Sequence, residues 1–497
     1  MGSIYLLLFL ASGCLMTIEL VAGRVVAPYV GVSLYTWTGI IGACLTGMSF
    51  GHLAGGWLAD RGDARRWLPR MFIAAAVLTS ALFLARPVIG TMAEALSARQ
   101  VPALVGIFLL STLFFGLPCF FLAAISPLLY KAALQSRQRV GSTVGRLAAS
   151  GIAGSIAGTY ATGFWLIPAY GTRSILLGIT LLLVALGAYS LVASPVRRAI
   201  TAAILIALPL AASAALPMRA AAQCDVESAY YCIRTVVTAG TTESGPVKRL
   251  RLDYLTHAGY AVNDPDALWY PYEQVVAWIM KASAEPDVRT LFLGGGGYML
   301  PHWVEKNFPW ATIDVVEVDP AVTQVAMREF VPTAKRIHSK NGDARLAMTQ
   351  LRPGRKYDVV FADVFSDLAV PYHLTTVEFA QLVKSRLAQP GLYIVNVIDN
   401  RDGGPLVGAM TATLKKVFPY VDVLPGNGGG IVRGPHILVA SANPLPWAEW
   451  DQHPERPSFI TGRMKVPDGG MVLTDDYVPT DNLLLPIFSD RWGVTRG

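Results

Sequence analysis

The chain has 497 residues, of which 53% are hydrophobic and only 15% are charged, whereas a soluble globular protein has about 25% charged residues. This composition excludes a disordered chain, a wholly soluble enzyme and a small disulfide-rich scaffold, and it favours a membrane protein with a soluble part. The charges divide unevenly: residues 1–222 hold 15 Lys/Arg and 4 Asp/Glu, and residues 223–497 hold 26 and 30. The excess positive charge therefore lies between apolar runs, as membrane-flanking charges do, and does not indicate a nucleic-acid partner.

The first 220 residues contain apolar runs of the length that a helix needs to cross a bilayer, about 20 residues. There are seven of them, at about 4–23, 35–59, 71–91, 103–130, 147–169, 174–194 and 199–216. The first run has no basic residue before it, and another apolar run follows at once, so it is read as a retained helix and not a signal peptide. We expect a polytopic α-helical membrane domain of about seven helices over residues 1–220.

The loop charges predict an orientation. The loops after the second, fourth and sixth runs carry ten Lys/Arg, and those after the first, third and fifth carry four. The positive-inside rule then places the N-terminus in the cytoplasm of a multi-pass protein of a bacterial cell membrane, and seven crossings leave the soluble part in the periplasm. Cys224 and Cys232, just after the last run, are either a disulfide suited to an oxidising compartment or two unrelated thiols.

Three polar or small-residue features lie within the apolar half. Glu19 is expected to pair with Arg24 or with a partner on another helix, although an ionisable residue at membrane depth is also a functional candidate. Residues 51–61 resemble the loop between the second and third helices of major facilitator transporters. A third feature is a face of small residues that allows helices to pack closely: Gly151, Gly154, Ser155 and Gly158.

The pattern changes near residue 220. Polar and apolar residues alternate over 233–237 and 248–254, which predicts a small antiparallel β subdomain over 221–285 that ends in a helix over 272–281. From residue 289 strands and helices alternate, with strands expected at 290–293, 313–319, 357–363 and 392–397. This order predicts a Rossmann-like α/β domain of methyltransferase type over 286–497, with a mainly parallel sheet.

Polar and glycine residues follow successive strands of that domain. Gly294 to Gly297 come after the first strand, and Glu317 lies near the end of the second, where an acidic residue commonly holds ribose hydroxyls. Asp343 follows the third strand and suits a purine amino group, and Asp363 ends the fourth. Ligands of such sheets bind beyond the carboxyl ends of the strands, so the four positions predict one nucleotide-like site. No Gly-Lys-Ser or Gly-Lys-Thr follows the glycines, which excludes a P-loop hydrolase.

At these residues the sequence resembles the spermidine synthase (polyamine aminopropyltransferase) family, in its bacterial membrane-fused branch. The resemblance covers about 223–440 for the catalytic part. It extends to residues 19–24 with Pro28 in the apolar half, and to three further segments: 363–367, 371–375 and 473–479.

The resemblance implies roles for individual residues. Asp363 matches the catalytic Asp of the family. The matches to donor-binding residues are Gly294, Gly295, Gly296, Glu317, Asp343 and, at the position of a family Gln, His257. Tyr272, Glu273 and Gln274 match the Tyr-His-Glu start of the family's helix, of which Tyr272 and Gln274 are expected to bind substrate. We expect Asp367 and Tyr298 to help place the acceptor.

Two departures bear on the acceptor. The family carries an Asp after three glycines, used to grip an amine, and here that position is Gly297. The second Asp of the family's catalytic loop comes three residues after the first, whereas Asp367 comes four after Asp363. Recognition of the amine is therefore the part of the family pattern that this chain does not obviously keep.

Three functions remain open. The first is transfer of an aminopropyl group from decarboxylated S-adenosylmethionine to an amine such as putrescine, with release of methylthioadenosine. The second is an S-adenosylmethionine-dependent methyltransferase, and the third is a non-catalytic polyamine- or nucleoside-binding transport or sensing protein. Each implies a small-molecule amine or nucleoside and the lipid bilayer as partners, with a homodimer as a further candidate assembly. No prosthetic group or metal is expected, and a periplasmic domain would lie away from a cytosolic sulfonium donor.

Overall fold

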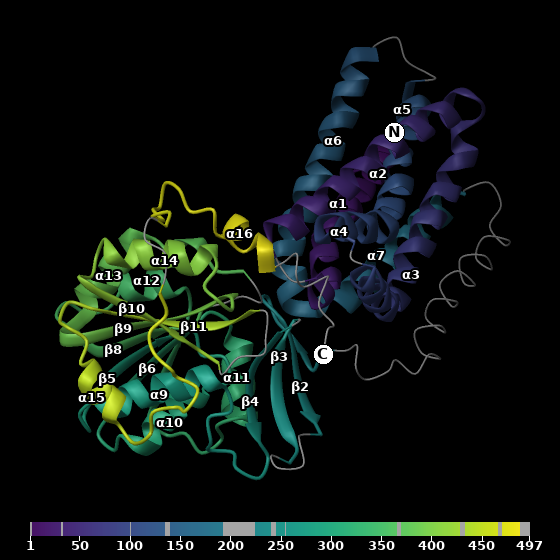
Figure 1. Cartoon of the computed structure of the whole chain (residues 1–497). Helices are drawn as coiled ribbons and strands as arrows, with labels where there is room; N and C mark the ends of the chain where they lie inside the picture. The colour runs from purple at the N-terminus through teal and green to yellow at the C-terminus, as the bar shows by residue number, and fades with distance from the viewer. Residues whose placement is uncertain are drawn as a thin grey trace. The chain divides into compact units, whose positions relative to one another are not determined.

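The computed structural model describes residues 2–30, 33–99, 101–134, 140–191, 224–239, 245–253, 255–364, 369–427, 433–465 and 470–487. The chain forms two compact units, divided in the sequence between Ala229 and Tyr230. We call the first the helical unit and the second the α/β unit, and describe each by itself (Figure 1).

Helices make up the helical unit, and six of the seven expected apolar runs lie on them. The seventh run, 199–216, falls outside the described residues. The elements are α1 (Gly2–Val30), α2 (Leu34–Asp60), α3 (Ala64–Ala98), α4 (Ala103–Ser111), η1 (Thr112–Gly116), α5 (Leu117–Leu134), α6 (Val140–Ala161), η2 (Thr162–Leu166) and α7 (Ile167–Ser190), followed by the short strand β1 (Val226–Glu227). Gly171, with a φ of +69°, interrupts the helical backbone within α7.

By length and composition, three of the described helical stretches are apolar enough to cross a membrane: Gly2–Ala27, Leu104–Leu134 and Ala169–Ser190. This supports the expected polytopic helical domain. The expectation of about seven crossings is not reached by this measure, because Gly, Thr and His dilute the apolar residues of α2, and arginines do so in α3.

Small residues bring the helices into backbone contact. A Cβ on Gly51 of α2 would lie 2.2 Å from the carbonyl oxygen of Phe120 on α5, and a Cβ on Gly154 of α6 would lie 2.0 Å from that of Phe9 on α1. Because any side chain at these positions would collide with a neighbouring backbone, the small-residue face of α6 serves helix packing, as expected.

The polar features of the helical unit differ from expectation in one respect. The Glu19–Arg24 ion pair does not form within the described part of the chain, and the buried Oε2 of Glu19 has no hydrogen-bond partner there. Asp60, at the end of the facilitator-like segment, pairs instead with Lys131 at 3.1 Å. Cys14, Cys44 and Cys119 are free thiols, whereas Cys224 and Cys232 are both disulfide-bonded.

The α/β unit contains two sheets. The smaller one includes the antiparallel strands β2 (Cys232–Thr238), β3 (Val247–Leu252) and β4 (Leu255–Ala261). The larger consists of β5 (Arg289–Leu293), β6 (Thr312–Glu317), β7 (Ile337–Asn341), β8 (Tyr357–Ala362), β9 (Leu387–Asn400), β10 (Tyr420–Pro425) and β11 (Arg433–Ser441). Its helices are α9 (Pro271–Ser283), α10 (Met299–Asn307), α11 (Pro320–Glu329), α12 (Ala344–Thr349), η4 (Tyr372–Leu374), α13 (Val377–Arg386), α14 (Pro405–Lys415), α15 (Trp447–Gln452) and α16 (Thr480–Leu483).

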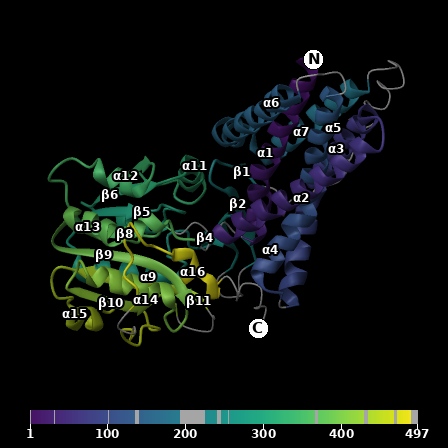
Figure 2. The ribbon, with the colours of Figure 1, turned by 90° about the horizontal axis from the view of Figure 1, so that it is seen from above.

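The larger sheet has the strand order β10-β11-β9-β8-β5-β6-β7. Strands β5 to β9 pair in parallel, and β10 and β11 add an antiparallel edge that the sequence reading had not anticipated. In the view from above, β10 and β11 lie at one edge and β6 toward the other (Figure 2). Helices α12, α13 and α14 cover one face, and α9, α10 and α15 the other (Figure 1).

The strands that were expected from their apolar runs form the centre of this sheet. Leu291 and Leu293 of β5, Val360 of β8 and Ile394 of β9 are almost fully buried, because both faces of a parallel sheet are covered by helices. From β5 the chain proceeds to β6 and β7 on one side and then returns to β8 on the other. The carboxyl ends of β5 and β8 therefore flank a topological switch point, where open α/β sheets bind ligands.

Candidate functional site

A cavity of about 730 Å³ lies at this switch point. Small-molecule sites commonly enclose roughly 300–1,000 Å³, so the size suits a nucleoside-like ligand. Its walls are formed by the glycine run after β5, the ends of β6 and β8, strand β4 and the start of α9. The residues that were expected after successive strands thus surround one space.

The glycine run brings the backbone close to the cavity. Gly294 has a φ of +89°, and a Cβ there would lie 2.0 Å from the carbonyl oxygen of Asp363, so only glycine fits. The N–H groups of Gly295 and Gly296 donate to Oε2 of Glu317 at 2.8 and 3.3 Å. The loop and the end of β6 are therefore fastened to each other.

Glu317 is only 6% exposed and lines the cavity. Its other oxygen, Oε1, accepts the N–H of Asp319 at 3.0 Å. Burial raises the pKa of Glu317, and the three backbone N–H groups act against that shift. The carboxylate is thus held in one orientation at the place where ribose hydroxyls are expected.

Asp343 begins α12 and contacts a histidine that the sequence reading had not assigned to the site. Its Oδ1 accepts the N–H of Leu346 at 2.8 Å, and its Oδ2 accepts Nε2–H of His373 at 2.7 Å. Burial acts to raise the pKa of Asp343, but these two donors outweigh it and hold the pKa below its ordinary value. Asp343 and His373 both line the cavity.

The C-terminal segment supports this wall. Arg345 donates to the carbonyl oxygen of His373 at 3.1 Å and pairs with both carboxylate oxygens of Asp475, at 2.7 and 2.6 Å. Thr376 donates to the same carboxylate at 2.8 Å, and the N–H of Val377 donates to the carbonyl of Leu473 at 2.9 Å. Segment 473–475, which resembles the family, therefore supports the cavity wall from outside.

Asp363 follows β8 and is held by two side chains. Tyr272 donates its hydroxyl to Oδ2 at 2.8 Å, and Asn396 donates Nδ2–H to Oδ1 at 2.9 Å. Burial raises the pKa of Asp363, and these two donors offset part of the shift. A fixed carboxylate of raised basicity facing the cavity can accept a proton from a bound nucleophile.

Two further titratable groups line the cavity. Glu273, at the start of α9, is 5% exposed, and burial raises its pKa to about 8. His257 of β4 has a buried Nε2 with no hydrogen-bond partner in the described chain, and burial lowers its pKa to about 4. At neutral pH the cavity lining therefore includes a neutral imidazole and a mostly protonated Glu273 beside Asp363.

Two of the expected site residues, Gln274 and Tyr298, do not line the cavity in the described structure. Gln274 is exposed and donates to the carbonyl of Leu268 at 3.0 Å. Tyr298 has a left-handed φ of 58° and is fully buried, and its hydroxyl bonds Ser339 and Thr323 at 2.6 and 3.0 Å. Its ring packs against Gly295 of the glycine run, and its expected role in placing the acceptor stays a prediction. Asp367 lies outside the described residues.

The structure also explains why position 297 carries no carboxylate. A Cβ on Gly297 would lie 2.2 Å from the Cβ of Ala258 on β4, far inside the contact distance of two carbon atoms, roughly 3.5–4.0 Å. The Asp that the family has at this position therefore cannot be accommodated while β4 carries Ala258. The departure from the family pattern is thus built into the packing of the small sheet against the loop.

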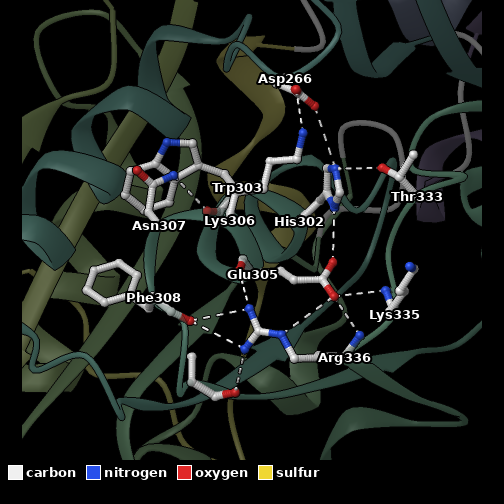
Figure 3. A network of polar contacts seen from close by, with 11 residues as sticks. Asp266, His302, Trp303, Glu305, Lys306, Asn307, Phe308, Thr333, Lys335 and Arg336 are labelled. Atoms are coloured by element: carbon white, nitrogen blue, oxygen red, sulfur yellow. Dashed lines mark hydrogen bonds and ion pairs between the residues drawn. The ribbon is translucent and has the colours of Figure 1, made fainter.

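Helix α10, which begins directly after the loop, is fixed by a polar network (Figure 3). Glu305 accepts the N–H groups of Lys335 and Arg336 at 2.8 and 2.6 Å, and also contacts His302 at 3.2 Å. The guanidinium of Arg336 donates to carbonyl oxygens at the end of α10, including that of Pro309 at 2.9 Å. The helix that carries the loop is therefore anchored to the segment before β7.

Comparison with known proteins finds relatives that match part of the chain. No protein-family model matches the chain. The polyamine aminopropyltransferase of Vibrio vulnificus (strain CMCP6) is 31% identical over 155 residues, which cover 30% of this chain and 50% of that protein. Over this stretch the chain is similar to a polyamine aminopropyltransferase. The human eEF1A lysine and N-terminal methyltransferase is 34% identical over 152 residues, covering 28% of this chain and 21% of that protein.

A solved structure of a probable spermidine synthase from Corynebacterium glutamicum ATCC 13032 aligns with a TM-score of 0.40 and 22% identity, covering 53% of this chain and 93% of that one. The chain spans half or less of the length of these two curated relatives. The chain is thus similar, over part of its length, to proteins named for two kinds of group transfer.

Two residues that bond the carboxylates of the site were not predicted from the sequence. Asn396 lies inside the long strand β9 and not at its end, so no strand-end pattern marked it. His373 stood within the segment that resembles the family, 371–375, but its contact with Asp343 depends on the turn η4. Only the three-dimensional arrangement brings these side chains to the carboxylates.

Proposed function

We propose that the protein is a membrane-anchored aminopropyltransferase, which transfers the aminopropyl group of decarboxylated S-adenosylmethionine to an amine and releases methylthioadenosine. The observation that carries this proposal is Asp363, a buried carboxylate facing the cavity and oriented by Tyr272 and Asn396. Asp363 lines the same cavity as Glu317 and Asp343, which would hold the nucleoside, so an amine bound beside the nucleoside could be reached by Asp363. The resemblance and the aminopropyltransferase relatives support the same assignment.

In the proposed reaction, the lone pair of the uncharged amine attacks the carbon bonded to the sulfonium. The new N–C bond forms as the C–S bond breaks, and the electron pair of that bond goes to sulfur. The proton lost by the amine goes to Asp363 and then to solvent. The protein's contribution is to align the two reactants and to keep a base beside the nitrogen.

The nucleoside part of the donor would be held by groups already oriented in the structure. Glu317 would accept hydrogen bonds from the ribose hydroxyls, and Asp343 from the purine amino group. His257, neutral because burial lowers its pKa to about 4, would lie near the sulfonium without opposing its charge. The glycine run lets the ligand approach the backbone closely.

A second function, S-adenosylmethionine-dependent methyl transfer, is favoured by one observation. Ala258 occupies the space that a loop carboxylate at position 297 would need, and that carboxylate grips an amine in the family that the chain resembles. The methyltransferase relatives, at 34% identity, match a stretch of similar length. A methyltransferase would keep the nucleoside contacts but would not need that carboxylate.

The test uses the purified full-length chain in detergent, given decarboxylated S-adenosylmethionine and a panel of amines, with methylthioadenosine release as the signal. Release should fall about 10²–10⁴-fold in Asp363→Asn, the range for loss of a general base. Asp287→Asn, an exposed carboxylate in the same unit, is the matched control and should be unaffected. Full activity in Asp363→Asn would refute the catalytic role.

The same assay separates the alternatives. Methyl transfer from S-adenosylmethionine, with no release from the decarboxylated donor, would identify a methyltransferase. Tight binding of nucleoside without turnover by either donor would identify a binding protein.

We also propose that the α/β unit faces the periplasm, as the loop charges predict. A reporter fused to the C-terminus and active on one side of the membrane only would decide this.

A further inference from the structure

Carboxylates are the feature of the cavity that bears on substrate charge. Among the described residues four of them line it: Glu273, Glu317, Asp343 and Asp363. Three have both oxygens engaged. Glu317 is bonded by backbone N–H groups, Asp343 by Leu346 and His373, and Asp363 by Tyr272 and Asn396.

Glu273 is different. Its Oε2 accepts the N–H of Tyr270 at 3.2 Å, and its Oε1 accepts no hydrogen bond from the described part of the chain. The residue is 95% buried, since 5% of it is exposed. Because Oε1 has no donor from the described chain and Glu273 lines the cavity, this group is suited to a ligand that brings a positive charge and N–H donors.

The neighbourhood of Glu273 points to the same kind of ligand. Asp363, the proposed base, is close enough for its negative charge to help raise the pKa of Glu273. Tyr270 and Tyr272, whose ring centroids are 5.5 Å apart, line the cavity beside it and offer aromatic faces. An ammonium placed here would stabilise the ionised form of Glu273 beside the charge of Asp363, and it would contact aromatic rings.

A second observation concerns what the cavity lacks. The family that the chain resembles places an amine-gripping Asp after three glycines, and here Ala258 occupies the space that its Cβ would need. Glu273 comes from a different element, the start of α9, but lines the same cavity as Gly297. The cavity therefore has no carboxylate at position 297 but has one at Glu273, on a different element.

We propose that Glu273 binds the terminal ammonium of the donor's propylamine arm, in place of the loop carboxylate that Ala258 excludes. The inference rests on the proposed function, because it needs the thio-nucleoside site. It adds the element that fixes the reacting arm: with its far end held at Glu273, the arm can direct its sulfur-bound carbon toward the nucleophile beside Asp363. Glu273 is thus a specificity-determining residue for a donor that ends in an amine.

The contribution of the propylamine arm to binding can be measured with two nucleosides whose sulfur is uncharged, because they differ only in the group on that sulfur. Methylthioadenosine carries a methyl group on sulfur, and 5′-deoxy-5′-(3-aminopropylthio)adenosine carries a propylamine in its place. Isothermal titration of both into the full-length chain in detergent gives their affinity ratio. Wild type should bind the propylamine compound more tightly, by roughly 10–100-fold, as expected for hydrogen bonds to a charged group.

The variants then test the assignment. In Glu273→Gln the preference should fall to less than about 3-fold, whereas methylthioadenosine should bind as in wild type, which also shows that the variant is folded. Glu273→Asp should keep part of the preference. Glu285→Gln, an exposed carboxylate further along the chain, is the matched control and should keep all of it.

Each outcome is decisive. A preference that survives in Glu273→Gln, or a wild type without any preference, overturns the role of Glu273 and leaves the nucleoside site standing. If wild type binds neither compound, the proposed function fails and this inference fails with it.

Discussion

The contact between Gly297 and Ala258 gives the sharpest test of the structure. A Cβ added at position 297 would lie 2.2 Å from the Cβ of Ala258, and a normal carbon–carbon contact is roughly 3.5–4.0 Å. The two atoms must therefore separate by about 1.5 Å. Neither belongs to a flexible side chain: Ala258 is buried in β4 and paired with Leu250 of β3.

The expected free energies follow from this geometry. Overpacking commonly costs about 1–3 kcal/mol, and Gly297→Ala should lie near the upper end because backbone has to move. Ala258→Gly removes one buried methyl group, about 0.8 kcal/mol, and places glycine in a strand, about 0.5–1 kcal/mol. The double variant should cost about as much as Ala258→Gly alone, since each change makes room for the other. The coupling energy should thus be about 2–3 kcal/mol.

Calorimetric unfolding of the full-length chain measures this cycle. For a domain of this size each kcal/mol lowers Tm by roughly 2–4 °C, so Gly297→Ala should lower the α/β transition by about 6–12 °C. Gly408→Ala on α14, where a Cβ meets no atom within 4 Å, is the matched control and should not lower Tm. If the two single effects simply add in the double variant, within about 0.5 kcal/mol, the close packing of β4 against the loop is wrong.

Three further predictions test other parts of the unit. Tyr272→Phe should slow methylthioadenosine release without weakening binding of methylthioadenosine, because the lost hydroxyl orients Asp363; weakened nucleoside binding with unchanged turnover would contradict this. The raised pKa of Glu273, about 8 in the folded chain against an ordinary 4.5, means that its stabilising effect is complete below pH 4.5 and is lost as the pH rises through 8. Denaturant unfolding should therefore show Glu273→Gln gaining stability relative to wild type between pH 5 and pH 9, and a constant difference would refute the shift. Arg336→Ala should destabilise the α/β unit by about 1–3 kcal/mol, because carbonyl oxygens at the end of α10 lose their donors; the exposed Arg401→Ala serves as control, and equal melting temperatures would argue against the anchoring role.

Much of the candidate site could be predicted from strand ends. Gly294, Glu317 and Asp363 follow apolar runs that read as strands, and parallel strands bring their carboxyl ends to one edge of a sheet. The cavity contains all three because this rule depends only on chain order and handedness. The alternation of apolar runs and helices was enough to predict the mainly parallel sheet for the same reason.

The other features of the site depend on backbone and side-chain conformations that no sequence pattern indicates. Tyr298 stood next to the glycines, but its left-handed backbone turns the ring under the loop. Glu273 occupies the first turn of α9, where a carboxylate commonly caps a helix, and only the cavity lining distinguishes it from such a cap. The close approach of Ala258 to Gly297 joins a strand of the smaller sheet to the loop after β5, which sequence spacing cannot foresee.

The support that Asp475 gives to the wall of Asp343 and His373 has a consequence for biosynthesis. Asp475 follows Arg345 by 130 residues, so at about 5–20 residues per second it leaves the ribosome roughly 7–26 s later. During that interval every strand of the seven-stranded sheet has been made, since β11 ends at Ser441, but Arg345 still lacks its partner. A nascent chain halted before Leu473 would therefore carry all seven strands of the sheet without the support that Asp475 gives to Asp343 and His373. The contact that supports the segment of Asp343 and His373 can therefore form only after the whole sheet has been made.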